Sequence, residues 1–298
     1  MTVEKAFEKF IHSRQLKGLS NKTVESYRLL TARFVEYIGT ETEMEFITQK
    51  NIEQFIEVLY THSLSIASIS TYIRNTRIFL KWYEKKHKVK YKASEIPIPR
   101  TPKKMVRLYS DEEITLIFKT VNTCAPWLDA RNRAMIALML DSGIRQGEVC
   151  NLEMENVHFD NSRMKVCGKG NKERFVPLGQ FSIAMLRKYL KMRPYDSKWV
   201  FISFYGDRLT CNAVKSMTGD LQKELPFEFS SHKLRHNFAT NYLINQYEMC
   251  GHMDIYQLMA IMGHEDTLTT QRYLHEAKNI IASRQCISHL DKILKYVM

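Results

Sequence analysis

A proline-containing basic segment near position 100 prevents this chain from folding as one continuous helical domain. Pro97, Pro99 and Pro102 lie close together, and each proline removes a helical hydrogen bond and disfavours helix at the residue before it. Residues 81–107 carry ten Lys and Arg against two acidic residues, a net charge of +8. This segment is either a solvated spacer or an extended strap that lies along nucleic-acid phosphates.

The segment divides the 298 residues into two parts, each long enough for an ordinary domain. We predict a helical domain at 1–92, a basic linker at 93–107 and a second domain at 108–298.

The charge balance indicates a polyanionic partner. Lys and Arg number 44 and Asp and Glu 32, a net charge of +12, which suits nucleic acid first and an anionic membrane surface second. The longest apolar run, 134–140, is far too short to span a bilayer, and the charged N-terminus has no signal-peptide core. We therefore expect a cytoplasmic protein that binds DNA or RNA and does not enter a membrane.

The six cysteines are scattered without a C-x-x-C pair, a pattern typical of a reducing compartment. Cys250 and His252 form an isolated C-x-H, which supplies too few ligands for a structural zinc site. We expect no bound metal.

Apolar residues recur at three- and four-residue steps through most of the chain, which predicts amphipathic helices. The clearest of these helices are expected at 20–39, 48–62, 65–86, 111–121, 129–143 and 180–190. Residues 163–178 change to a strand-like period around the turn Gly-Lys-Gly-Asn, which predicts a β-hairpin. The expected fold class is mostly α with a small antiparallel β-sheet.

Three short stretches contain residues that could carry chemistry, and each also has an ordinary structural interpretation. Arg145 follows a glycine between two predicted helices, where it could bind a phosphate or simply pair with Glu148. Lys169 stands between two glycines at the hairpin tip, as a surface charge or as a proton donor. His232 and Arg235 are three residues apart on a predicted helix and share one face, which could be merely solvated.

Taken in chain order, these residues and "GHEDTLTTQRYLH" at 263–275 resemble the tyrosine recombinase (phage integrase) family. The resemblance rests on "GKGNKERFVPLG", "HKLRHNFAT" and "LMAIMGHEDTLTTQRYLH", and covers nearly all of the second domain. The N-terminal "LSNKTVESYRLL" resembles the helical, SAM-like core-binding domain of the same family. The resemblance implies an α+β catalytic domain and site-specific DNA strand exchange, with no metal and no energy cofactor.

The resemblance also implies a catalytic set that cuts DNA through a 3′-phosphotyrosine link and rejoins it. The set comprises Arg145, Lys169, His232, Arg235, His264 and Tyr273. Tyr273 would be the nucleophile, His232 its proton acceptor and Lys169 the acid that protonates the leaving 5′ oxygen. The two arginines and His264 would bind the phosphate oxygens. The competing Tyr242 and Tyr256 lie at apolar helical spacing, and we expect both in the core.

The expected partners are a double-stranded DNA recombination site and further copies of this chain, as a tetramer on two duplexes. The predicted DNA-contacting cations are Lys85, Lys86, Lys88, Lys90, Lys103, Lys104, Arg107 and Lys172. Residues 276–298 follow the nucleophile and would form a tail helix with an apolar stripe made by Ile280, Ile281, Ile287, Leu290 and Leu294. This helix either packs on its own domain or docks in trans on a neighbouring protomer, and we favour docking in trans.

The biological role is open between two kinds of recombinase. Residues 245–257 look longer than in compact Xer-type members and are expected to form a loop, and Gln146 and Gly147 stand beside Arg145 where a hydrophobic and a small residue are more usual. We therefore favour the integrase or resolvase of a mobile element over Xer-type chromosome-dimer resolution. A type IB topoisomerase is a rival with the same chemistry, and the helical N-terminal domain and the hairpin argue against it. A non-catalytic DNA-binding regulator would leave the complete catalytic set unexplained.

Overall fold

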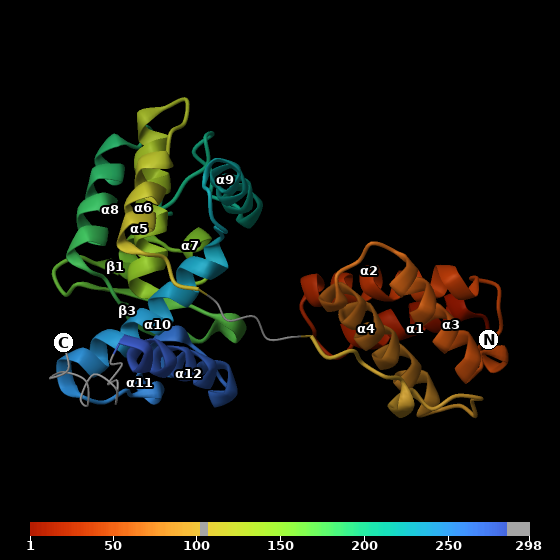
Figure 1. Ribbon diagram of the computed structural model, residues 1–298. Helices are drawn as coiled ribbons and strands as arrows, with labels where there is room; N and C mark the ends of the chain where they lie inside the picture. The colour runs from red at the N-terminus through yellow and green to blue at the C-terminus, as the bar shows by residue number, and fades with distance from the viewer. Residues whose placement is uncertain (102–106, 285–298) are drawn as a thin grey trace, which may run out of the picture. The chain divides into compact units, whose positions relative to one another are not determined.

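The computed structural model describes residues 1–101 and 107–284. Its contacts divide the chain into two compact units, Met1–Lys104 and Met105–Met298 (Figure 1). In the described part of the chain, no helix is long and apolar enough to cross a membrane.

The first unit is a helical bundle. Its helices are α1 (Val3–Gln15), α2 (Asn21–Ile38), α3 (Gln49–Thr61) and α4 (Ile66–Glu84). The expected helix at 20–39 is confirmed at both ends: Ser20 caps the first turn of α2 by accepting from Thr23 N, and Gly39, with φ of 92°, ends the helix. Phe10 and Phe79 pack edge to face at the centre, with ring centroids 5.3 Å apart.

The core of the first unit extends beyond α4 into the basic segment. Ala93 lies in the 3-10 turn η2 (Ala93–Glu95), and both Ala93 and Ile96 are buried in the same cluster as Phe79. Part of the stretch that we expected as linker is therefore anchored to the first unit.

The second unit contains most of the secondary structure. Its helices are α5 (Asp111–Thr120), α6 (Pro126–Ser142), α7 (Gln146–Cys150), α8 (Gln180–Met192), α9 (Cys211–Glu224), α10 (Ser231–Cys250), α11 (Ile255–Met262) and α12 (Thr267–Arg284). Helix α6 is buried along most of its length and packs against α8 and α10. A separate cluster of buried side chains joins α10, α11 and α12, which lie together in Figure 1.

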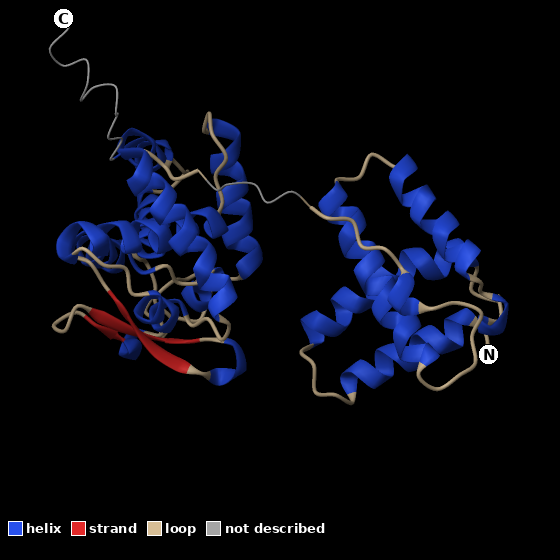
Figure 2. Ribbon diagram, turned by 60° about the horizontal axis from the view of Figure 1, so that its bottom comes forward, coloured by secondary structure: helices blue, strands red, loops and turns tan. Residues whose placement is uncertain are grey.

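A small sheet lies at one edge of the second unit (Figure 2). Strands β1 (Val157–His158), β2 (Arg163–Cys167) and β3 (Glu173–Pro177) are antiparallel in that order. The predicted hairpin is confirmed as β2 and β3, and so is the mostly helical fold class. The pattern missed β1 because two residues are too few to show an alternating period.

Two expectations about residues 245–257 are wrong. They do not form one long loop, since α10 continues to Cys250 and α11 begins at Ile255, which leaves only residues 251–254 as the connection. Tyr256 is 71% exposed, because the buried face of α11 is formed by Leu258 and Met262, and a residue two positions from Leu258 points elsewhere on a helix.

Candidate active site

A cavity of about 1060 Å³ in the second unit collects most of the predicted catalytic residues. Five of the six line it: Arg145, His232, Arg235, His264 and Tyr273. The structure describes only the backbone of Lys169, which begins the 3-10 turn η4 (Lys169–Asn171) between β2 and β3. Gly168 and Lys172, on either side of that turn, also line the cavity.

The carboxyl ends of two helices hold the two arginines. Arg235 Nη1 donates to the carbonyl of Gly143 after α6, and Nη2 donates to the carbonyl of Met262 at 2.7 Å, in the last turn of α11. Arg145 Nη2 donates to the carbonyl of Gly263 at 2.8 Å. Carbonyls at helix ends lack intrahelical partners, so each guanidinium satisfies groups that the helix leaves open and is oriented by them.

Gly143 is required at the first of these helix ends. It ends α6 in the left-handed conformation, with φ of 62°, a region that only glycine enters readily. A Cβ atom at this position would lie 2.2 Å from the Phe238 ring. Gly143 therefore forms a tight helix end two residues before Arg145, and the Gly143 carbonyl accepts the hydrogen bond from Arg235.

Glu148 is a buried carboxylate that binds two guanidinium groups. Arg145 Nη1 donates to Oε1 at 2.9 Å, and Arg174 donates from Nη1 and Nη2 to the two oxygens at 2.7 and 2.8 Å. Burial alone would raise the pKa of Glu148, but hydrogen bonds from Arg174 and Arg145 outweigh it and the pKa is lowered. The sequence predicted the pairing of Glu148 with Arg145 and missed Arg174, whose place in a strand gave no signal.

His264 contacts Arg235 on one side and Thr270 on the other. Its Nε2 lies 3.1 Å from Arg235 Nη2, and its Nδ1 lies 2.9 Å from the hydroxyl of the buried Thr270. Burial, aided by the charge of Arg235, lowers the pKa of His264 to about 4. Burial and the charge of Arg145 lower the pKa of Arg235 to about 10, so Arg235 stays charged and His264 neutral near pH 7.

Tyr273 projects from α12 among these side chains and is 3% exposed. Its ring stacks on His264, with centroids 6.2 Å apart, and meets His236 edge to face at 5.0 Å. Burial raises the pKa of Tyr273, although the charges of Arg235 and Arg272 oppose the rise. The phenol is therefore protonated near pH 7 and needs a proton acceptor before it can attack.

Two residues that the sequence did not single out contact this group. His236 Nε2 lies 3.1 Å from His232 Nε2 and 3.1 Å from Arg272 Nη2. Partial burial and the charges of Arg272 and Arg235 lower the pKa of His232, which remains exposed to solvent. Each missed residue is the chain neighbour of a predicted one, Arg235 or Tyr273, and that adjacency was the available signal.

The predicted DNA-contacting cations fall into three groups. Exposed lysines of the first unit are Lys85, Lys86, Lys88 and Lys90. Arg107 pairs with Glu113 at 2.6 Å, and Lys172 with Glu265 at 2.6 Å. Lys103 and Lys104 lie outside the described residues. These contacts do not test a role in DNA binding.

The structure describes only the first part of the predicted tail helix, and this part belongs to α12. Ile280 and Ile281 belong to α12, and Ile281 is buried in the cluster that contains Tyr273, so this part of the stripe packs on its own unit. Ile287, Leu290 and Leu294 lie outside the described residues.

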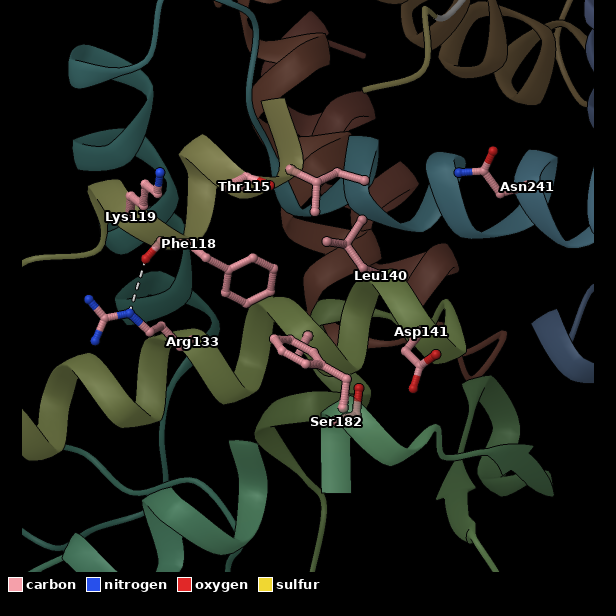
Figure 3. Close-up of a pocket in the computed structure, with 11 residues that line it drawn as sticks. Thr115, Phe118, Lys119, Arg133, Leu140, Asp141, Ser182 and Asn241 are labelled. Atoms are coloured by element: carbon pink, nitrogen blue, oxygen red, sulfur yellow. Dashed lines mark hydrogen bonds between the residues drawn. The ribbon is translucent and has the colours of Figure 1, made fainter. Parts of the chain in front are cut away.

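A second cavity, of about 630 Å³, lies between α5, α6, the start of α8 and α10 (Figure 3). Phe118, Leu140 and Phe181 give it an apolar lining, and Arg133 Nε donates to the carbonyl of Phe118 at 3.0 Å. The candidate catalytic residues that the structure describes do not line this cavity. Among the described side chains, no group of three or more His, Cys, Asp or Glu is arranged to hold a metal ion.

Comparison with known proteins assigns both units of the chain to one family. Residues 107–279 match the model of the phage integrase family, and residues 6–87 match the phage integrase N-terminal SAM-like domain. The chain belongs to the phage integrase family of tyrosine recombinases.

Curated relatives span almost the whole chain. Tyrosine recombinase XerC of Oceanobacillus iheyensis is 28% identical, covering 96% of each chain, and tyrosine recombinase XerD of Staphylococcus saprophyticus is 29% identical, covering 94% of this chain and 96% of its own.

Two solved structures share the fold. XerH bound to palindromic difH substrate has a TM-score of 0.72 at 21% identity, covering 94% of this chain and 83% of its own. The Tn1549 transposon integrase in complex with transposon right end DNA has a TM-score of 0.71 at 16% identity, covering 96% and 99%.

Proposed function

We propose that this chain is a site-specific DNA recombinase that cuts and rejoins DNA strands through a 3′-phosphotyrosine formed by Tyr273. The observation that carries the proposal is the shared cavity, where Tyr273 lies with Arg145, Arg235, His232 and His264. Cations and hydrogen-bond donors grouped around a tyrosine suit attack on a phosphodiester, whose reaction builds negative charge on the phosphate oxygens.

In this proposal the two arginines bind the non-bridging oxygens of the phosphate. Each guanidinium offers several N–H donors and stays protonated without help from a metal. Arg145 is the more accessible of the two, because Arg235 is buried and its Nη2 also contacts His264. Exchange of that contact for a phosphate oxygen would let Arg235 and His264 together bind the reacting group.

Proton transfer is assigned to His232 and Lys169. His232 accepts the phenol proton as Tyr273 attacks, and its lowered pKa leaves it neutral and able to accept near pH 7. Lys169 gives a proton to the 5′ oxygen as that oxygen leaves. The phosphotyrosine link conserves the bond energy, so a 5′ hydroxyl from a partner strand reverses the step and completes the exchange.

The proposed partner is a duplex recombination site, held by the cationic residues of both units. The similar XerH and transposon integrase structures contain DNA substrates, which supports this partner. We propose a tetramer on two duplexes in the cytoplasm, with the tail beyond α12 docked on a neighbouring protomer.

Two biological roles are candidates, and we place the integration or resolution of a mobile element first, because Gln146 and Gly147 beside Arg145 depart from the Xer pattern. The Tn1549 transposon integrase and XerH both share the fold, which is therefore compatible with either role. Xer-type resolution of chromosome dimers is the second candidate, because the XerC and XerD relatives match from end to end.

The test is capture of the protein's own target from fragmented DNA of its host. Purified protein is incubated with the fragments in EDTA, and SDS-resistant protein–DNA adducts are isolated and sequenced. We expect adducts at one discrete sequence from the wild type and none from Tyr273→Phe. Adducts spread over all sequences would indicate a topoisomerase, and a requirement for Mg²⁺ would contradict the mechanism.

The position of the captured sequence decides between the two roles. A sequence at the ends of a mobile element supports the first role. A single chromosomal site, with chromosome dimers that accumulate when the gene is deleted, supports the Xer-type role.

A further inference from the structure

His236 is a buried histidine at the centre of the site that the proposed mechanism does not use. It follows His232 by four residues on α10, so the two side chains lie on the same face of the helix. Its side chain is 3% exposed. The titratable or charged groups around it come from α10, from α12 and from the turn before α12. They are His232, Arg235, Arg272, Tyr273 and His264.

The contact with Arg272 defines the protonation of the His236 ring. Arg272 Nη2 lies 3.1 Å from His236 Nε2, and a guanidinium nitrogen can donate a hydrogen bond and cannot accept one. His236 Nε2 therefore carries the lone pair, and the proton lies on Nδ1, which is buried without a hydrogen-bond partner among the described residues. Burial, reinforced by the charge of Arg272, lowers the pKa of His236 to about 4, which agrees with a neutral ring near pH 7.

The same lone pair defines the protonation of His232. His232 Nε2 lies 3.1 Å from His236 Nε2, with the two rings nearly perpendicular at 86°. Since His236 Nε2 accepts, His232 Nε2 must be the donor in this pair. A neutral His232 then has its proton on Nε2 and its free lone pair on Nδ1.

We propose that His236 is a positioning residue that fixes His232 in the Nε2–H tautomer, so that His232 Nδ1 is the atom that accepts the proton in catalysis. His236 also holds Arg272, whose guanidinium carbon lies 5.7 Å from the centre of the Tyr273 ring. One ring thus connects the proton acceptor, a cation and the nucleophile. The inference rests on the proposed roles of Tyr273 and His232.

Two variants separate tautomer control from simple packing. His236→Phe keeps a ring of similar size and removes the acceptor, whereas His236→Gln keeps an acceptor oxygen near the position of Nε2. General acid–base catalysis contributes on the order of 10²- to 10⁴-fold, and we expect His236→Phe to lose about 10-fold or more in single-turnover cleavage. His236→Gln should cleave within about threefold of the wild type, because its side-chain oxygen can still accept from His232 and so preserve the proton transfer.

The decisive readout is the tautomer of His232, measured by nitrogen NMR of the histidine-labelled full-length protein, with His232→Gln used to assign the signals. We expect the Nε2–H form in the wild type and in His236→Gln, and a shift away from it in His236→Phe. Wild-type cleavage by His236→Phe, or slow cleavage with an unchanged His232 tautomer, would overturn the inference. Adduct formation by Tyr273→Phe would instead show that the proposed function is wrong.

Discussion

Glu148 binds Arg174 through both of its carboxylate oxygens, at 2.7 and 2.8 Å, and the pair is almost fully buried. Arg174 lies on the hairpin strand β3, and Glu148 lies on α7 beside Arg145. Arg174 Nε also donates to the carbonyl of Ile261 on α11 at 2.7 Å. This ion pair therefore fixes the hairpin, the start of α7 and the end of α11 around one candidate phosphate site.

Replacing Glu148 by Gln should cost both stability and cleavage. Removing one partner of a buried ion pair leaves an uncompensated charge, and we expect a loss on the order of 3 kcal/mol in the free energy of unfolding. Cleavage should slow as well, because Arg145 loses its orienting partner. Denaturant unfolding and single-turnover cleavage measure the two effects. Asp220→Asn, which removes an exposed ion pair of the same unit, is the control and should change neither.

Lowering the pH should reduce the difference in the free energy of unfolding between the wild type and Glu148→Gln. Folding lowers the pKa of Glu148, so its contribution to stability is present above the usual carboxyl range of about 4.3 and is lost as the pH falls through the folded value. The free energies of unfolding of the two proteins, measured at pH 7 and at successively lower pH, should approach each other as the pH falls. A constant difference across this range would show that the charge of Glu148 is not what stabilises the fold.

The two left-handed glycines that end α6 and α10 should respond differently to alanine. Gly251, with φ of 74°, has no atom within 4 Å of an added Cβ. Gly251→Ala should therefore lower the free energy of unfolding by about 1 to 2 kcal/mol, from backbone strain alone. Gly143→Ala adds the clash with Phe238 and should lower the free energy of unfolding by about 1 to 3 kcal/mol more. Thermal unfolding compares them, and equal losses would mean that Phe238 moves freely.

The general acid can be identified through the leaving group. Lys169→Ala should cleave an ordinary phosphodiester on the order of 10²- to 10⁴-fold more slowly, if Lys169 protonates the departing oxygen. A substrate with sulfur at the bridging 5′ position needs no proton and should restore its rate, whereas Arg145→Ala should stay slow on both substrates. Lys172→Ala controls for loss of positive charge at the same hairpin. Failure of sulfur to restore Lys169→Ala would place the acid elsewhere.

The tail beyond α12 should act between protomers. Deletion of 285–298 leaves α12 and its Arg284–Glu248 ion pair in place, so binding to a single site should be retained while cooperative binding and synapsis are lost. Replacement of Ile287, Leu290 and Leu294 by Ser should give the same result in a full-length chain, and Lys292→Ser should not. Gel-shift titration measures this, and unchanged cooperativity would contradict docking in trans.

Residue order was enough to predict most helices, the hairpin and five of the residues that line the site, because each depends on local periodicity or on a motif. What it missed depends on contacts between distant positions. Arg174 meets Glu148 from 26 residues away, and Arg272 meets His236 from 36, and neither separation leaves a periodic signal. The prediction that Tyr256 lies in the core was wrong for a local reason. Apolar spacing alone does not say which face of α11 is buried.

The central claim is that Tyr273 forms the covalent bond to DNA, and peptide mapping of the adduct tests it most directly. A nicked duplex of the captured target sequence traps the cleaved intermediate, and the protein is then digested and analysed by mass spectrometry. We predict that the nucleotide remnant lies on the peptide containing Tyr273, that Tyr273→Phe yields no adduct, and that Tyr256→Phe yields the same adduct as the wild type. A remnant on any other residue, or an adduct from Tyr273→Phe, would contradict the account.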